Sequence, residues 1–248
     1  MDLVERLRVA AAGAPSDRRG RPVRLTVLPA CSAAEIAALQ ARYDVPLPAE
    51  LTSLLATTRG VVGLPDLDLE LDGSLAGGVE LAELMPAPLP VAADRAGNFW
   101  VLDLTPDTTE AAPVFFACHD PAVLLYQAPD LATFLEEVLQ RLSPPHRSVL
   151  DDVRDDRLFD VWGSRPGALG QPAALRAPDL ALREFATTLD PAWTVVDLRQ
   201  RQVGMGVAWG RYGPRTRLAR HGWERIFGYA PHAEPRRTWR RVFRRPRV

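Results

Sequence analysis

The chain has few of the features that mark exported or membrane-spanning proteins. It contains only two cysteines, Cys31 and Cys118, whereas secreted disulfide scaffolds are small and dense in cysteine. No stretch approaches the roughly 20 uninterrupted apolar residues of a membrane-spanning helix. Asp2 and Glu5 stand where a signal peptide would be basic. These absences predict a cytoplasmic protein whose two cysteines fill its core.

The usual arrangements of metal and cofactor ligands are also missing. Its four histidines are scattered and follow no H-x3-H or H-E-x-x-H spacing: His119, His146, His221 and His232. Gly-Met-Gly at residues 204–206 lacks the strand and helix context of a phosphate-binding loop. We therefore expect no metal, no cofactor and no small-molecule substrate.

Lysine is absent, so all 30 basic residues are arginines, and they are unevenly distributed. Residues 1–142 hold 20 acidic residues and 10 arginines, a net charge of −10, and residues 143–248 hold 11 and 20, a net charge of +9, which together give −1. The sign changes at Ser-Pro-Pro-His, residues 143–146, where consecutive prolines end a helix. This predicts a domain boundary. The halves either bind different partners or pack through complementary faces.

The first half has helical patterns at both ends and strand patterns between them. Residues 32–35, Ser-Ala-Ala-Glu, form a capping box before an apolar stripe at helical spacing. Strict alternation of leucine and acid over residues 67–72 predicts a half-buried strand. Helices are expected at 2–12, 32–43, 48–59 and 131–142, and further strands at 24–28, 89–93, 98–104, 114–118 and 123–126. Consecutive strands without alternating helices predict an α+β fold, with an antiparallel sheet and helices packed on one face.

Four motifs within residues 24–142 resemble those of the SMI1/KNR4 (SUKH) family. They are Leu-Pro-Ala-Glu-Leu at 47–51, Gly-Asn-Phe-Trp-Val-Leu-Asp at 97–103, Val-Phe-Phe-Ala-Cys-His-Asp at 114–120, and Phe-Leu at 134–135. The glycine-rich turn of the family is here Arg-Gly-Val-Val-Gly, residues 59–63, which departs from its pattern. The resemblance implies an α+β fold that acts by protein–protein contact. Bacterial members are frequently immunity proteins against polymorphic toxins, many of them nucleases, and fungal members are regulatory hubs.

The one cluster that could suggest an enzyme is Cys118, His119 and Asp120. A histidine beside a carboxylate can act as a general base with its orienting partner. Neighbouring residues on a strand point to opposite faces, however, and no G-x-S-x-G motif is present. We interpret the pair as the end of a strand and the start of a turn, and predict no catalytic residues.

An acidic strand face is the better candidate for a functional site. Asp68, Glu70 and Asp72, with Asp66 just before them, would present a row of carboxylates to a basic protein. The alternative is an ordinary solvated strand face. The predicted partner-binding residues are Asp66, Asp68, Glu70, Asp72, Asp94, Trp100, Asp103 and Asp120.

The second half resembles no family known to us. It is expected to contain a helix at 179–188, a strand pair at 193–198 and 203–210, and strands at 215–219 and 223–229. The last thirteen residues hold seven arginines with Trp239 and Phe243, a combination that can clamp nucleic acid or dock on an acidic protein surface. The possible nucleic-acid contacts are Arg236, Arg237, Arg240, Arg241, Arg244 and Arg245.

These observations predict a division of the chain into four parts. Residues 1–23 form an N-terminal helix and loop, 24–142 the SUKH-like domain, 143–178 a linker, and 179–248 a small β-rich extension with an arginine-rich tail. The predicted function is non-catalytic protein binding, as an immunity protein that neutralises a bacterial toxin. The alternative is a nucleic-acid-associated or regulatory scaffold protein that uses the tail.

Overall fold

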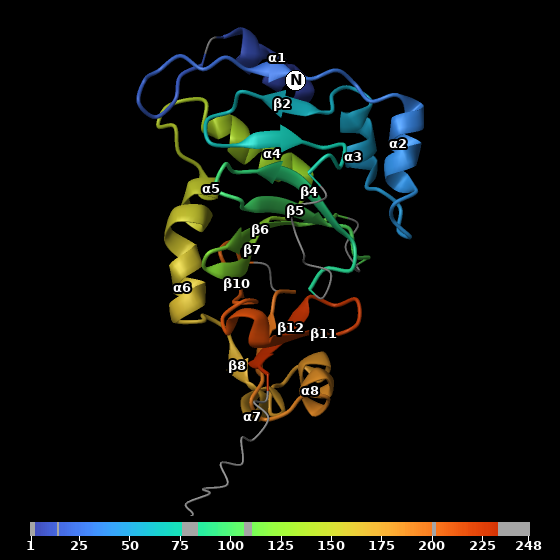
Figure 1. Cartoon of the computed structure of the whole chain (residues 1–248), viewed down its shortest axis with the longest axis vertical. Coiled ribbons are helices and arrows are strands. Elements are labelled where there is room, and N and C mark those ends of the chain that lie inside the picture. Colours follow the sequence, from blue (N-terminus) through green and yellow to red (C-terminus); the bar gives the residue numbers. More distant parts are fainter. Residues whose placement is uncertain (1–2, 14, 76–83, 107–110, 200–201, 233–248) are drawn as a thin grey trace, which may run out of the picture.

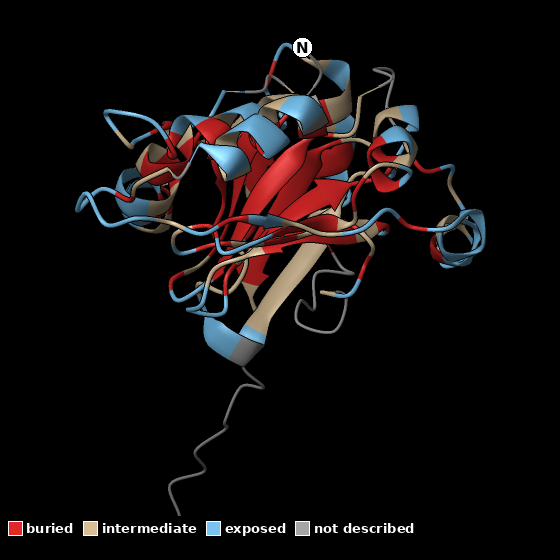
Figure 2. Ribbon diagram, turned by 90° about the horizontal axis from the view of Figure 1, so that it is seen from above, coloured by how far each residue is buried: buried red, intermediate tan, exposed pale blue. Residues whose placement is uncertain are grey.

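A computed structural model describes residues 3–13, 15–75, 84–106, 111–199 and 202–232. Its strands stack down the long axis of the molecule, with α1 at one end and a second, smaller sheet with α7 and α8 at the other (Figure 1). Figure 2 shows the strands buried at the centre, with the exposed residues on the surrounding helices and loops. All strand pairs among the described residues are antiparallel, which confirms the predicted α+β fold.

The larger sheet has eight strands in the order β1-β2-β3-β4-β5-β6-β7-β10. Its strands are β1 (Thr26–Val27), β2 (Gly60–Val62), β3 (Asp68–Glu70), β4 (Pro88–Ala93), β5 (Phe99–Asp103), β6 (Val114–His119), β7 (Ala122–Ala128) and β10 (Gly206–Val207). Seven of them follow one another in the chain as neighbours in space. The eighth, β10, comes from the second half and pairs with β7, so the sheet crosses the predicted domain boundary.

Four helices belong to the first half: α1 (Leu3–Ala12), α2 (Ala33–Gln40), α3 (Ala49–Leu55) and α4 (Leu131–Gln140). The capping box of α2 is present as predicted, because Ser32 accepts from the Glu35 amide and Glu35 accepts from the Ser32 amide. The carboxylate of Asp130 accepts from the Thr133 amide at 2.7 Å and caps α4. The apolar stripe of α4, including Phe134 and Leu135, is buried.

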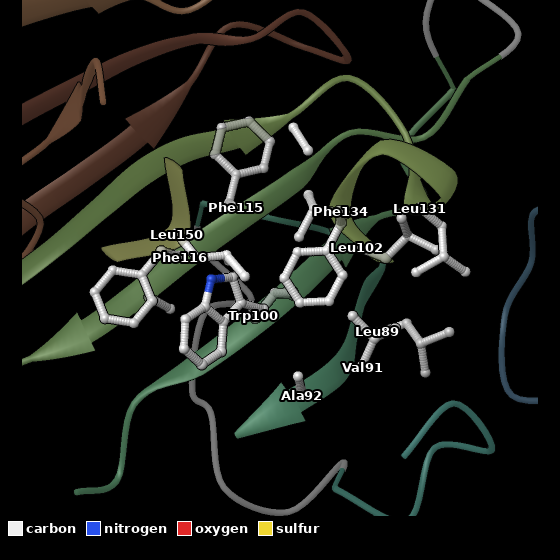
Figure 3. Packing of buried hydrophobic residues seen from close by; sticks show 14 of the residues in the cluster. Leu89, Val91, Ala92, Trp100, Leu102, Phe115, Phe116, Leu131, Phe134 and Leu150 are labelled. Carbon is white, nitrogen blue, oxygen red and sulfur yellow. The ribbon is translucent and has the colours of Figure 1, made fainter. Parts of the chain in front are cut away.

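The core has aromatic side chains on both faces of the sheet. Trp100 on β5 lies 5.0 Å from Phe116 and 6.1 Å from Phe134 of α4, measured between ring centroids. Phe115, one residue along β6, contacts Tyr126 instead and points away from that group (Figure 3). Both faces at the centre of the sheet are therefore covered.

In its described residues, the second half adds four helices, two short 3-10 or π segments and the smaller sheet, which has the order β11-β12-β9-β8. Its elements are α5 (Val149–Asp151), η1 (Asp152–Arg157), α6 (Leu158–Gly163), β8 (Leu169–Gly170), α7 (Gln171–Ala174), α8 (Leu180–Thr187), β9 (Thr194–Asp197), η2 (Gly213–Arg215), β11 (Thr216–Arg220) and β12 (Ile226–Pro231). The carboxylate of Asp179 caps α8 by accepting from the Leu182 amide.

The linker predicted at residues 143–178 is wrong, because this segment is structured. Ser148 and Asp151 form a second capping box, after which α5, η1 and α6 run on as one helical segment. Its buried residues, Leu150, Val153, Leu158 and Val161, join the main core. The segment is therefore part of the same folded unit as the sheet.

The strand pair predicted for residues 193–198 and 203–210 is also wrong. β9 lies between β12 and β8 in the smaller sheet, whereas β10 extends the larger sheet beside β7. Gly206 has a structural reason to be glycine, since an added Cβ would lie 2.1 Å from the Leu124 carbonyl oxygen. The neighbouring segments thus belong to different sheets.

Candidate protein-binding surface

The carboxylates of Asp68, Glu70 and Asp72, which we call the acidic row, stand on the outward face of β3 and just beyond it. The intervening residues Leu67, Leu69 and Leu71 are at most 1 % exposed. Because side chains alternate between the two faces of a strand, burying the leucines directs the acids outward. The side chains of Asp68 and Asp72 are 39 % and 24 % exposed.

Arginines stand at both ends of the acidic row. Asp68 lies 3.9 Å from the Arg95 guanidinium, and Asp72 lies 3.7 Å from that of Arg59. Glu70, in the middle, accepts from the Ser74 hydroxyl and makes no ion pair within the described ranges. The row is therefore compensated at its ends, and its uncompensated negative charge is concentrated at Glu70.

Helix α2 extends this surface beyond Asp72. Glu35 in its first turn is 2.9 Å from Arg59, the same arginine that approaches Asp72. Hydrogen bonds from the Ser32 amide and hydroxyl, and then from Arg59, lower the pKa of Glu35 to about 2. Glu35 is therefore ionised throughout the physiological range and adds a fixed negative charge next to the row.

A cavity of about 210 Å³ opens between α2 and Asp72. Its floor is apolar, with Ile36, Leu39 and Leu55, and its rim carries Glu35 and Arg42. We call it the α2 cavity. An apolar depression with charges on its rim suits one apolar side chain of a partner surrounded by polar contacts. No motif in the sequence pointed to this part of the surface, although the capping box places Glu35 at the exposed start of a helix.

Two other predicted residues, Asp94 and Asp120, lie in turns at one end of the sheet. Asp94 accepts from the amides of Ala96 and Asn98 and from the Asn98 side chain, so its carboxylate holds the turn between β4 and β5. Asp120 is exposed in the turn between β6 and β7. In register, Asp68 stands opposite Ala93, so the Asp94 turn continues from the acidic row.

Trp100 and Asp103 were predicted to contact a partner, and their burial contradicts this. Trp100 is 1 % exposed and packs under α4, while Asp103 is 0 % exposed. The Asp103 carboxylate accepts from Arg225 Nε at 2.9 Å and lies 3.3 Å from an Arg220 nitrogen. We call these three residues the junction triad. The carboxylate of Asp103, the last residue of the motif at 97–103, is therefore paired with arginines of the same chain and is not available to a partner.

The cluster considered for an enzyme does not form a catalytic arrangement. Cys118 is buried, and this burial raises the pKa of its thiol. His119 points to the other face, where its Nδ1 lies 2.9 Å from the Asn98 side-chain oxygen. In the ranges that the structure describes, no group of three His, Cys, Asp or Glu residues could hold a metal ion.

The arginine-rich tail, with Arg236, Arg237, Arg240, Arg241, Arg244 and Arg245, lies outside the described residues. Its role as a nucleic-acid contact therefore stays a prediction. Within the described part of the chain, no helix has both the length and the continuous apolar character needed to cross a bilayer.

Comparison with known families supports the resemblance seen in the motifs. Residues 30–137 match the model of the SMI1 / KNR4 family (SUKH-1). This segment runs from just before α2 to within α4 and contains the acidic row and the α2 cavity. No curated protein matches the chain.

Proposed function

Since residues 30–137 are a SUKH-1 domain of the SMI1 / KNR4 family, we propose that the chain is a protein-binding module that neutralises a bacterial toxin by direct contact. Membership of this family supports protein partners in general. The observation that carries the proposal further is the acidic row beside the α2 cavity. Together they offer a charged and an apolar subsite on one continuous surface.

The chemistry of the surface favours a basic partner. Glu70 would pair with an arginine or lysine of the toxin, and the α2 cavity would take an adjoining apolar side chain. Complementary charge of this kind accelerates encounter and excludes partners of the wrong sign. A toxin that acts on nucleic acid would carry such a basic surface at its active site, so binding there would block its substrate. The site of action would be the cytoplasm, where such a toxin meets its target.

The experiment measures binding to the protein encoded immediately upstream, because immunity genes sit beside their toxin genes. Glu70→Arg should weaken the complex by about tenfold or more, since like charges then face each other across the interface. Glu184→Arg makes the same charge change on the exposed face of α8 and serves as the matched control. Equal affinity for both variants and the unsubstituted chain would overturn the proposed surface. Turnover of a substrate by the purified chain would overturn the non-catalytic role.

A second candidate function rests on the seven arginines of residues 236–248. A nucleic-acid-associated role predicts that the chain is retained on immobilised nucleic acid, that this retention falls steeply with salt, and that it disappears when residues 236–248 are removed. Binding to the toxin should be unaffected by this truncation. The two functions can therefore be separated with one truncated variant.

A further inference from the structure

A second cavity, of about 410 Å³, lies between the loop after α1, the turn before β3 and the end of α4. We call it the arginine cavity, because Arg18, Arg19, Arg21 and Arg141 contribute to its wall. Asp17, Asp66 and His146 complete the charged and titratable groups there. The four guanidinium groups outnumber the two carboxylates, so the lining carries an excess of positive charge.

Arg141 is the deepest of these groups. Its side chain is 7 % exposed, and its Nε lies 3.4 Å from a carboxylate oxygen of Asp151 without a hydrogen bond to it. No acceptor among the described residues bonds to this Nε. Burial lowers the pKa of Arg141, with Asp151 acting in the opposite direction. A buried guanidinium without its full set of acceptors is costly, and a negative charge in the cavity that Arg141 lines would offset this cost.

Asp151 cannot compensate all the arginines around it. Its carboxylate is 0 % exposed and lies 3.4 to 3.6 Å from nitrogens of three arginines, namely Arg18, Arg141 and Arg154. The Asp155 carboxylate pairs with the Arg154 guanidinium at 2.9 Å but lies 4.0 Å from that of Arg18. Arg18 and Arg141 therefore share a single buried negative charge.

The loop that carries Arg18 and Arg19 is held in place by Asp17. This carboxylate accepts from the backbone amides of Arg19 and Arg21, at 2.8 and 2.9 Å, and from the Arg21 guanidinium at 2.6 Å. These bonds, with Arg21 as the largest contributor, lower the pKa of Asp17 to about 2. Asp17 and Arg21 thus compensate each other and leave Arg18 and Arg19 in a preorganised turn.

We infer that the arginine cavity binds a small ligand through a phosphate group, with Arg18, Arg19 and Arg141 as its donors. Guanidinium groups bind phosphate oxygens bidentately, and a tetrahedral dianion can accept from several of them at once. Asp66, beside the cavity, opposes the ligand's charge and limits its affinity. Free phosphate and a phosphorylated small molecule share this chemistry. Asp66, which was predicted to bind a partner together with the acidic row, lines this cavity. The inference does not depend on toxin binding.

The test is titration calorimetry of the full chain with inorganic phosphate and with adenosine monophosphate, at constant ionic strength set with chloride. We expect saturable binding of at least one ligand with one site per chain. Equal affinity for both would identify the phosphate group alone as the ligand, and tighter binding of the nucleotide would identify a phosphorylated small molecule. Absence of saturable binding by both would overturn the inference.

Variants separate a binding site from a general effect of positive charge. Arg19→Gln should weaken binding about tenfold, as expected for the loss of a charge-assisted hydrogen bond. Arg157→Gln, which removes an exposed arginine from the end of η1, is the matched control and should leave affinity unchanged. Asp66→Asn should tighten binding severalfold, a gain that an unfolded or damaged variant cannot produce. Equal weakening by Arg19→Gln and Arg157→Gln, or no gain with Asp66→Asn, would overturn the site.

Discussion

The acidic row and the junction triad both use carboxylates on strands of one sheet, yet their surroundings give them opposite roles. Asp68 and Asp72 are partly exposed and stand 3.7 to 3.9 Å from their arginines. Asp103 is fully buried and has two buried arginines within 3.3 Å. Exposed ion pairs contribute little to stability and leave a carboxylate available to a partner. A buried carboxylate that is paired with buried arginines contributes to the stability of the fold and cannot contact a partner.

The junction triad joins the two halves of the chain through opposite charges, an acid from the first half and two arginines from the second. Arg220 and Arg225 come from the hairpin of β11 and β12, and Asp103 comes from the sheet of the first half. Arg18 with Asp151 also links residues on either side of the predicted boundary, but here the arginine belongs to the acidic half. Complementary packing of the halves, one of the two alternatives left open by the sequence, therefore describes the junction triad and not every ion pair between the halves.

The largest expected effect comes from breaking the triad. Asp103→Asn removes the negative charge but leaves Arg225 buried, which should lower the free energy of unfolding by about 3–5 kcal/mol. Asp68→Asn removes a partly exposed carboxylate from the same sheet and should change it by less than about 0.5 kcal/mol. Urea unfolding of both variants measures the difference. Similar values for the two would contradict the distinction between the regions.

The acidic row and the junction triad also differ in how far they could be predicted from the sequence. The alternation of residues 67–72 and the capping box at Ser32 are local signals, and each predicted its element correctly. The partners of Asp103 lie 117 and 122 residues away in the chain, so no local pattern could reveal its burial. The motif predicted that Asp103 lies on a strand, but it could not predict which residues bury it.

The helical segment missed at residues 149–163 has a different cause. Its buried apolar positions, 150, 153, 158 and 161, contain a step of five residues that breaks the usual spacing of three or four. The π-helix η1, at Asp152–Arg157, accommodates this step because its wider turn keeps both sides of the gap on one face. A search for α-helical periodicity alone passes over such a segment.

A moderate effect is expected from the helix that borders the α2 cavity. Ser32→Ala removes the side-chain acceptor of the capping box and should cost about 1 kcal/mol of unfolding free energy. Ser53→Ala, on the exposed side of α3, is the matched control, since its hydroxyl only donates back to the Ala49 carbonyl. Urea denaturation measures the free energy of unfolding of both variants, and only Ser32→Ala should lower it appreciably. If the cavity serves the partner, Ser32→Ala should also weaken toxin binding, whereas Ser53→Ala should not.

The smallest expected effect is on the way the free energy of unfolding changes at acidic pH. Glu35 has its pKa lowered from 4.5 to about 2, with the hydrogen bonds from Ser32 as the main cause. A carboxyl with a lowered pKa in the folded state stabilises that state above its unfolded value, and the contribution is lost as pH falls from about 4.5 towards 2. Glu35→Gln should therefore reduce the slope of unfolding free energy against pH in this window. The measurement is a series of urea titrations between pH 5 and pH 2.

Glu50 provides the contrast for this experiment, because burial raises its pKa, with a smaller contribution from Asp130. Its ionised form is disfavoured in the folded state, so stability gained from this group increases as pH falls through its folded pKa. Glu50→Gln should remove this gain at pH values above about 4.5, whereas Glu35→Gln flattens the loss of stability below about 4.5, so the urea titrations are extended upward to pH 7 for this variant. If both variants changed the slope in the same direction, the contrast between the hydrogen-bonded Glu35 of α2 and the partly buried Glu50 of α3 would be wrong.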